Sequence, residues 1–351
     1  MRDVYDVTIV GGGPAGLYSA FYSGLRNMKT KLIESQKELG GKVLLFQEKM
    51  IWDVGGQPPI LGSQFVKQII SQAKTFDPTI ITNTKVDFIE KDDTNLFIIT
   101  TNDGVKHYSK SIIMAVGGGI INPQKLEIDG AEKYEMSNLH YTIPSLKPFQ
   151  QKRVLISGGG NGAIDWAVEL LDIAEEVIVA YRKDQFSAHE AQTARILADS
   201  KAKVLFNTSI ERLIPNKEKT LIQQAVLKQD GKEESLIQPV DHIIVCHGYN
   251  RDASLGFAEN INLSLKDNYY YEGTSKGHTS QEGIYAAGDI LSFDGKVNLL
   301  VGAFQDAVNA VNSAKKYIEP TAESIGIVSS HNEKFKKQNK QIIRQILVEQ
   351  K

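Results

Sequence analysis

The sequence predicts an α/β protein with two similar domains, the second inserted into the first. A strand, a glycine-rich loop and a helix follow one another near the start of the chain, and the same succession recurs near its middle. A later strand that ends in Gly288-Asp289 leads back to the first domain. With 351 residues the chain is long for one compact core. Each succession opens a Rossmann-like dinucleotide-binding domain of the three-layer ββα type.

Glycines mark the expected domain boundaries. The cluster Gly117-Gly118-Gly119 breaks the chain after a strand, and Gly248 follows another strand. We expect residues 1–117 and 249–351 to form the discontinuous first domain, with residues 320–351 as a C-terminal tail. Residues 118–248 are expected to form the inserted domain.

The composition excludes several functional classes. A net charge of −2 argues against a general nucleic-acid binder, which normally carries a basic excess. No apolar run approaches the roughly 20 residues that span a bilayer, so no membrane insertion is expected. A strand pattern begins within a few residues of Met1, which predicts that there is no signal peptide. We therefore expect a cytoplasmic protein, and no metal site is predicted.

The cysteine content limits the redox chemistry. Cys246 is the single cysteine of the chain, so no intramolecular disulfide can form. This excludes a mechanism in which a pair of redox-active cysteines within this chain relays electrons. Cys246 ends the apolar run Ile243-Ile244-Val245, a context that favours a packing residue over a reactive thiol.

The first glycine loop lies between a β-branched strand and an apolar helix. Gly11, Gly13 and Gly16 have the G-x-G-x-x-G spacing, which permits a tight turn and lets a pyrophosphate approach the helix N-terminus. Glu34 ends the next strand, where a carboxylate accepts hydrogen bonds from ribose hydroxyls. A dinucleotide site is predicted, with these residues in contact with it: Gly11, Gly13, Pro14, Ala15, Gly16 and Glu34.

A distant second signal selects FAD over NAD for this loop. Gly288-Asp289 follows a strand, a pattern in which the carboxylate bonds the ribityl chain of a flavin. The segment from Val301 to Ala307 then begins a helix. A helix N-terminus aimed at the pyrimidine edge of the flavin would stabilise the negative charge of its reduced form. We therefore expect FAD in the first domain.

The second glycine loop has the variant spacing G-x-G-x-x-A, at Gly158, Gly160 and Ala163, again between strand and helix. Its second strand ends in Arg182 and Lys183, and basic groups there would pair with a ribose 2′-phosphate. NADPH is therefore expected over NADH, although a solvated strand end is the alternative interpretation. The residues expected at this site are Gly158, Gly160, Asn161, Gly162, Ala163, Arg182 and Lys183.

The remaining patterns complete the element order. Tail residues Ile342, Ile343, Ile346 and Leu347 lie on one side of a predicted basic amphipathic helix. Helices are also expected at residues 17–25 and 164–173, and strands at 7–10, 31–34, 87–101, 108–116, 153–156, 176–180, 241–246 and 284–287.

FAD and NADPH in one chain imply hydride transfer from the nicotinamide to the flavin.

Several stretches of the chain carry a family resemblance. The chain resembles the two-dinucleotide-domain flavoproteins related to thioredoxin reductase, and over nearly its whole length it is most similar to the bacterial type 2 (thioredoxin reductase-like) ferredoxin–NADP reductases. Thioredoxin reductases carry a Cys-x-x-Cys pair before the second loop, and residues 138–153 hold no cysteine, so that activity is excluded. The stretches that carry the resemblance are residues 11–17, 38–41, 138–141, 158–167 and 294–297.

The resemblance also implies flavin contacts. Phe46 stands where a tyrosine usually stacks on one flavin face, and a phenyl ring keeps that role. In Val328-Ser329-Ser330-His331 the usual histidine is displaced, so either Val328 or His331 would cover the other face. Ser187 replaces a frequent arginine, which leaves the 2′-phosphate to Arg182 and Lys183. The implied FAD contacts are Glu34, Lys42, Phe46, Val86, Ile121, Asp289 and Ser330, with Lys42 in place of a common glutamine and Ile121 in place of an aromatic residue.

Several acceptors are consistent with this chemistry. The resemblance implies ferredoxin or flavodoxin and a homodimer, and basic tail residues would steer an acidic partner. The alternatives are a reductase of quinones, free flavins or ferric chelates, a bacillithiol-type disulfide reductase, and an FAD-binding redox sensor without turnover. Bacillithiol disulfide reductases carry a cysteine at the position of Ala15. The basic tail residues are Lys334, Lys336, Lys337, Lys340 and Arg344, for which a solvated helix face is the alternative interpretation.

Overall fold

In the computed structural model the chain divides into two compact units. Unit 1 consists of Met1–Ile120 and Arg251–Lys351, and unit 2 is the continuous segment Ile121–Asn250. The structure describes residues 2–119, 122–250, 254–326, 331–336, 339–340 and 342–344. The predicted flavin contacts Ile121, Val328 and Ser330 therefore lie outside the described residues.

Unit 1 is built on a parallel sheet that continues into an antiparallel one. Strand β1 (Val4–Val10) pairs in parallel with β2 (Thr30–Ile33) and with β8 (Lys106–Met114). Strand β2 pairs with β5, and β8 pairs in parallel with β22 and antiparallel with β7. The other strands of this sheet are β5 (Thr79–Ile81), β6 (Val86–Lys91), β7 (Phe97–Thr101), β19 (Gly256–Phe257) and β22 (Ile284–Ala286).

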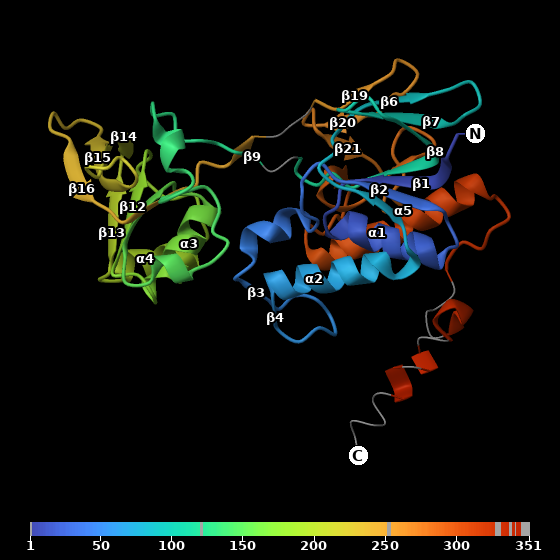
Figure 1. Cartoon of the computed structure of the whole chain (residues 1–351), viewed down its shortest axis with the longest axis horizontal. Coiled ribbons are helices and arrows are strands. Elements are labelled where there is room, and N and C mark those ends of the chain that lie inside the picture. The colour runs from blue at the N-terminus through green and yellow to red at the C-terminus, as the bar shows by residue number, and fades with distance from the viewer. Residues whose placement is uncertain are drawn as a thin grey trace. The chain divides into compact units, whose positions relative to one another are not determined.

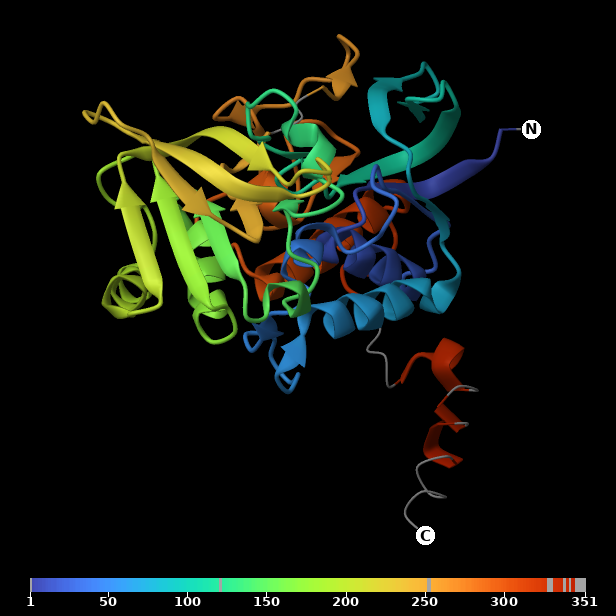
Figure 2. The ribbon, with the colours of Figure 1, turned by 60° about the vertical axis from the view of Figure 1, so that its left-hand side comes forward.

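Three layers form around this sheet. Helices α1 (Pro14–Leu25), α2 (Gly62–Ala73) and α5 (Leu300–Ile318) cover one face, as both ribbon views show (Figures 1 and 2). Successive strand residues point to opposite faces, so Val7 and Ile9 of β1 pack with the helices while Val10 packs with β6 and β7. The expected ββα layering is confirmed.

Short elements fill the rest of unit 1. Strands β3 (Met50–Ile51) and β4 (Ile60–Leu61) pair antiparallel before α2. Strand β21 (Tyr270–Glu272) pairs with β20 (Leu265–Lys266) and β23 (Leu291–Ser292). The 3₁₀ turns are η1 (Gly41–Phe46), η2 (Lys74–Phe76), η5 (Gly288–Ile290) and, in the tail, η7 (Glu333–Phe335).

Unit 2 repeats the plan with a five-stranded parallel sheet in the order β10-β17-β11-β12-β13. Leu155, Ile178 and Ile243 from one face of this sheet pack against Ile210 and Leu227 of an antiparallel layer. The sheet strands are β10 (Leu139–His140), β11 (Arg153–Ser157), β12 (Glu176–Tyr181), β13 (Ala202–Phe206) and β17 (His242–Val245). The antiparallel layer is β14 (Thr208–Pro215), β15 (Ile222–Gln229) and β16 (Leu236–Pro239), and the helices are α3 (Asn161–Leu171) and α4 (Glu190–Ala198). Smaller elements are β9 (Asn122–Pro123), β18 (Tyr249–Asn250), η3 (Ala131–Tyr134) and η4 (Lys147–Phe149).

Two helices begin earlier than the hydrophobic pattern predicted. Helix α1 begins at Pro14 and not at Leu17, because proline is well suited to the first helical position. Helix α3 begins at Asn161 and not at Ile164, so both glycine loops run directly into a first helical turn. In the tail, Ile342 and Ile343 are exposed by 52% and 55%, and Ile346 and Leu347 lie outside the described residues. No described helix is both long and apolar enough to cross a membrane.

Candidate functional site: two glycine loops

The first glycine loop is packed so closely that only glycine fits at two positions. Gly11 has φ +109°, and a Cβ added to it would lie 2.4 Å from the carbonyl oxygen of Ala115. A Cβ added to Gly16 would lie 1.9 Å from the carbonyl oxygen of Gly11. The loop therefore folds back on itself between β1 and α1, which is the turn that the G-x-G-x-x-G spacing predicted.

The N-terminus of α1 offers an anion site. No side chain caps this end of the helix, because the N-cap residue is Gly13, and the first turn contains no acidic residue. A Cβ added to Gly13 would meet only Gly41, at 3.7 Å from its Cα, so the backbone can be approached closely there. Free N–H groups and the positive end of the helix dipole suit a phosphate anion. This cradle fits the pyrophosphate of a dinucleotide.

The Glu34 carboxylate is fixed beside the same loop. Glu34 is 7% exposed, and one of its oxygens accepts the N–H of Gly12 at 2.5 Å. The other oxygen accepts the N–H of Gln36 at 2.7 Å and the hydroxyl of Ser35 at 3.0 Å. A carboxylate accepts about four hydrogen bonds, so acceptor capacity remains for a ribose hydroxyl. This remaining acceptor capacity fits the ribose on the adenosine side of FAD.

The structure brings the second flavin signal to the first loop. Gly288 has φ +76°, and a Cβ added to it would lie 2.9 Å from the Cβ of Ala15 in the first turn of α1. Asp289 is the next residue and is half-buried within η5. The two signals, far apart in the sequence, therefore lie side by side in unit 1.

Three other predicted flavin contacts, Lys42, Phe46 and Val86, belong to η1 and β6. A Cβ added to Gly41 would lie 2.7 Å from the Cα of Gly13, so η1 begins against the loop with Lys42 exposed beside it. Phe46 ends η1 and is half-buried. Val86 is buried and begins β6, two residues after Thr84, whose N–H donates to the carbonyl of Glu34 at 3.0 Å.

The described part of the tail contacts a different region of unit 1. The Tyr22 hydroxyl accepts the N–H of Gly326 at 3.2 Å, and the ring of Phe335 lies 5.3 Å from that of Phe76. His331 is exposed, four residues before Phe335. Its assignment to a flavin face stays a prediction.

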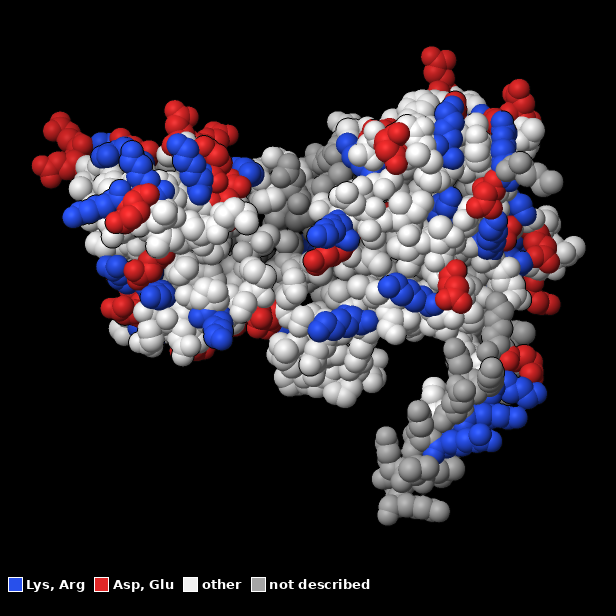
Figure 3. Space-filling view, viewed as in Figure 1, with Lys and Arg blue, Asp and Glu red and all other residues white. Residues whose placement is uncertain are grey.

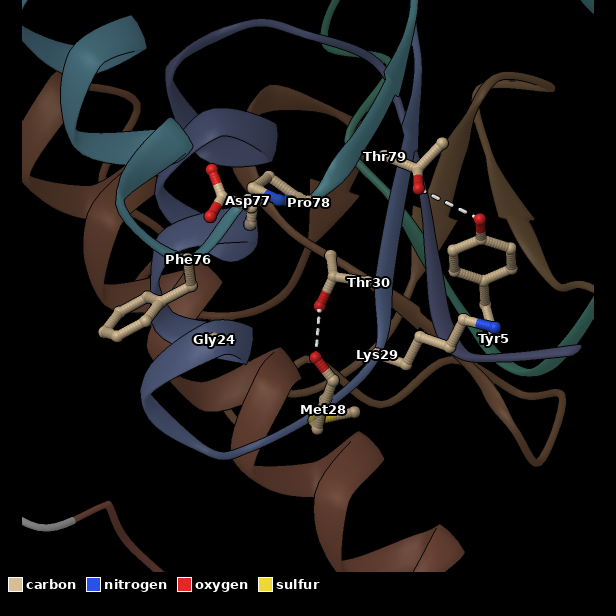
Figure 4. A pocket seen from close by; sticks show the side chains of 10 residues that line it. Tyr5, Gly24, Met28, Lys29, Thr30, Phe76, Asp77, Pro78 and Thr79 are labelled. Atoms are coloured by element: carbon tan, nitrogen blue, oxygen red, sulfur yellow. Dashed lines mark hydrogen bonds between the residues drawn. The ribbon is translucent and has the colours of Figure 1, made fainter. Parts of the chain in front are cut away.

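A cavity of about 240 Å³ opens at the amino ends of the parallel strands of unit 1, at the end of the sheet opposite to the first glycine loop (Figure 4). Its lining includes Tyr5, Thr30 and Thr79, which are the first or second residues of the neighbouring parallel strands β1, β2 and β5. The Tyr5 and Thr79 hydroxyls are hydrogen-bonded to each other at 2.9 Å. Dinucleotides bind at the carboxyl ends of parallel strands, so this cavity is not the site prepared by the glycine loop.

The second glycine loop has the same strained geometry. Gly158 has φ +146°, and a Cβ added to it would lie 2.5 Å from the carbonyl oxygen of Cys246. A Cβ added to Gly159 would lie 2.3 Å from the ring of Tyr181, whereas additions at Gly160 and Gly162 would meet nothing within 4 Å. The loop is packed against its own unit at the first two glycines and open at the next two.

The N-terminus of α3 is likewise uncapped by side chains. Gly160 is its N-cap, and the first turn contains no acidic residue. The Asn161 side-chain oxygen accepts the N–H of His189 at 3.0 Å and holds the following loop in place. Arg182 and Lys183 follow the adjacent strand β12 and are exposed, and neither is paired with an acid among the described residues. Two exposed cationic side chains and a helix N-terminus without a side-chain cap are groups that suit a phosphorylated dinucleotide.

One residue near this loop was not predicted from the sequence to have a functional role. The His247 Nε2 atom lies 2.8 Å from the Oγ of Ser157, the last residue before the loop. Desolvation and the positive charge of Arg182 lower the pKa of His247, although the residue keeps exposed surface. Its position two residues after β17, at the carboxyl edge of the sheet, was the signal that could have revealed it.

A second histidine pair gives a testable pH dependence. His140 Nε2 lies 3.0 Å from His242 Nδ1, and desolvation, with the neighbouring His242, lowers the pKa of His140 to about 4. The unfolded chain then binds more protons than the folded chain between about pH 4 and the ordinary pKa of 6.5. The contribution of neutral His140 to the free energy of unfolding is therefore complete above pH 6.5, and it is lost as the pH falls towards 4.

Urea unfolding of unit 2 followed across this pH range should therefore show a falling midpoint towards acid. His140→Phe keeps the ring contact with Phe149, whose centroid lies 5.2 Å away, and should flatten the dependence. His189→Phe, at an exposed position of the same unit, serves as the control. An unchanged slope in His140→Phe would contradict the assignment.

Comparison with known proteins identifies a family and two close relatives. A family model described as pyridine nucleotide-disulphide oxidoreductase matches residues 5–314. Ferredoxin–NADP reductase 3 of Lysinibacillus sphaericus is 62% identical over 348 residues, which cover 99% of each chain. Ferredoxin–NADP reductase 2 of Exiguobacterium sibiricum is 53% identical over 346 residues, which cover 99% of this chain and 98% of the relative.

Solved structures share the fold. The thioredoxin reductase of Lactococcus lactis matches with a TM-score of 0.71 at 25% identity, covering 90% of this chain and 99% of that one. The bacillithiol disulfide reductase of Bacillus cereus matches with a TM-score of 0.66 at 19% identity, covering 90% of this chain and 100% of that one. At this identity the second likeness shows the fold alone.

Proposed function

The chain belongs to the pyridine nucleotide-disulphide oxidoreductase family, and within it to the ferredoxin–NADP reductases, and we propose that it reduces ferredoxin or flavodoxin with electrons from NADPH. FAD and NADPH are the cofactors of this family. When bound, FAD would supply a group that can take up a hydride and give up its two electrons one at a time. The observation that carries the proposal is the pair of glycine loops at uncapped helix N-termini. The strands next to them are followed by opposite charges, Glu34 in unit 1 and Arg182-Lys183 in unit 2.

Each unit then has a defined part in binding. In unit 1 the N-terminus of α1 holds the FAD pyrophosphate, Glu34 the ribose, and Asp289 the ribityl chain. Lys42, Phe46 and Val86, with Ile121, Ser330 and either Val328 or His331, complete the proposed flavin surroundings. In unit 2 the N-terminus of α3 holds the NADPH pyrophosphate, and Arg182 and Lys183 pair with the 2′-phosphate.

The proposed protein partner is acidic. Lys and Arg side chains gather along the described part of the tail (Figure 3). Lys336, Lys340 and Arg344 are all exposed there. A cluster of cations steers a small acidic partner towards the surface and raises its association rate at low salt.

The test of the function compares donors and acceptors. Under anaerobic conditions NADPH should bleach the bound flavin quickly and NADH slowly. Cytochrome c reduction should then rise steeply when ferredoxin or flavodoxin is added. Turnover of quinones, free flavins or ferric chelates that exceeds this rate would favour the alternative reductase, and a flavin that NADPH leaves oxidised would favour a redox sensor.

Cys246 provides a separate prediction about thiol chemistry. Burial raises the pKa of the Cys246 thiol to about 12, so a nucleophilic thiolate is scarce at neutral pH. Cys246→Ser is therefore expected to leave ferredoxin reduction within about twofold of the unaltered enzyme, because it is a conservative change of a single atom that removes no assigned cofactor contact. Turnover of bacillithiol disulfide that Cys246→Ser abolishes would instead support a disulfide reductase.

A homodimer and a cytoplasmic location complete the proposal. The homodimer follows from the family resemblance alone, and the location follows from the composition and the N-terminal strand pattern. Sedimentation of the purified flavoprotein tests the dimer, and fractionation of the source cells tests the location. A monomer at micromolar concentration, or recovery with the membrane fraction, would count against them.

A further inference from the structure

A buried ion pair lies behind the proposed ribityl contact. Asp306, on α5, is 3% exposed, and its carboxylate is paired with the ammonium group of Lys296. The side chain of Lys296 is itself 9% exposed and comes from the loop that precedes α5. Neither group was assigned a role by the sequence patterns.

The same carboxylate oxygen has a second partner. It accepts the backbone N–H of Gly288 at 3.1 Å, and Gly288 is buried. The preceding residue is anchored on the other side, because the N–H of Ala287 donates to the carbonyl of Met114 at 3.0 Å. The turn that leads to Asp289 is therefore held from both sides, by strand β8 and by the side chain of Asp306.

We propose that Asp306, neutralised by Lys296, is a positioning residue that fixes the Gly288–Asp289 turn in the shape that presents Asp289 to FAD. The inference rests on the proposed role of Asp289. A buried amide needs an acceptor, and the turn cannot move away from α5 without losing the one that Asp306 supplies. If the turn were held less firmly, ordering it would reduce the net free energy of FAD binding.

The ammonium group of Lys296 makes a carboxylate possible at this position. A buried charge without a partner is costly, and replacing both partners with neutral groups of similar volume avoids that cost. Charge and hydrogen bonding can therefore be separated by paired substitutions. D306N/K296M removes both charges and keeps an oxygen that can accept the Gly288 N–H. D306L/K296M is equally neutral and has no acceptor.

The experiment measures FAD affinity by titrating apoprotein and following the fluorescence of the flavin. D306N/K296M should bind FAD within about threefold of the unaltered protein, because its Gly288 acceptor remains. D306L/K296M should bind about ten- to a hundredfold more weakly, the range for losing a hydrogen bond to a buried polar group. If that variant folds poorly, D306A/K296M removes the acceptor with less volume to repack and should show the same loss. K315M/E319Q, which removes an ion pair at the other end of α5, is the matched control.

A double-mutant cycle with Asp289 identifies the route of the effect. If Asp306 acts through Asp289, then D306L/K296M should add little to the loss already caused by Asp289→Asn. Fully additive losses, or equal FAD affinity in D306N/K296M and D306L/K296M, would overturn the positioning role while leaving the proposed function intact. If Asp289→Asn alone leaves FAD affinity unchanged, the assigned role of Asp289 fails, and this inference fails with it.

Discussion

Reversal of the two charges that follow β12 is expected to invert the nicotinamide preference. In R182E/K183E the proposed 2′-phosphate partners become anions, so kcat/KM for NADPH should fall by roughly two to three orders of magnitude. Loss of two charge-assisted hydrogen bonds, at about 1.5–3 kcal/mol each, accounts for a change of this size. With NADH, which lacks the phosphate, kcat/KM should change by less than about threefold. Stopped-flow reduction of the bound flavin by each donor measures both values.

The control for this experiment must carry the same change of charge. K217E/K232E reverses two exposed lysines in the loops of the antiparallel layer of unit 2, away from the glycine loop. This control should leave the ratio of the two donors unaltered. Equal losses with NADPH and NADH in R182E/K183E would show that the pair forms a solvated strand end with a general structural role, and the assignment of the 2′-phosphate contact would fail.

The second large effect is expected in the first glycine loop. In Gly16→Ala the methyl group, at its ideal position, would lie 1.9 Å from the carbonyl oxygen of Gly11, so the loop must open. Such a clash costs about 1–3 kcal/mol, and the pyrophosphate cradle is deformed. We expect this variant to be purified largely without FAD and to unfold at lower urea concentration than the unaltered apoprotein.

Gly13→Ala separates the effect on the ligand from the effect on the fold. Its methyl group would meet only Gly41, at 3.7 Å, so the stability of the apoprotein should not change. The same methyl group occupies space that a pyrophosphate needs, and FAD affinity should fall by about ten- to a hundredfold. Gly55→Ala, at a position with nothing within 4 Å, is the control. Normal FAD content in Gly13→Ala would mean that the pyrophosphate does not approach this backbone.

Local chemistry explains why so much of the fold could be predicted. A G-x-G-x-x-G loop between a strand and a helix specifies its own turn, and the structure shows the positive φ of Gly11 and of Gly158 that such turns require. Helix starts were misplaced by three residues at Pro14 and Asn161, because the glycine loop and the first helical turn share residues. The charges that distinguish the two loops, Glu34 and Arg182-Lys183, are also local, since each follows its strand directly.

The sequence by itself determined two dinucleotide loops of unequal charge and the absence of a cysteine pair. Only the tertiary structure decided which distant groups support them: Gly288 against Ala15, Asp306 and Lys296 behind Gly288, and His247 beside Ser157. Turns and strand ends depend on neighbours within a few residues, whose conformational preferences the sequence displays. A contact between α5 and a turn 18 residues earlier depends on how the layers pack, and no short-range pattern encodes that packing.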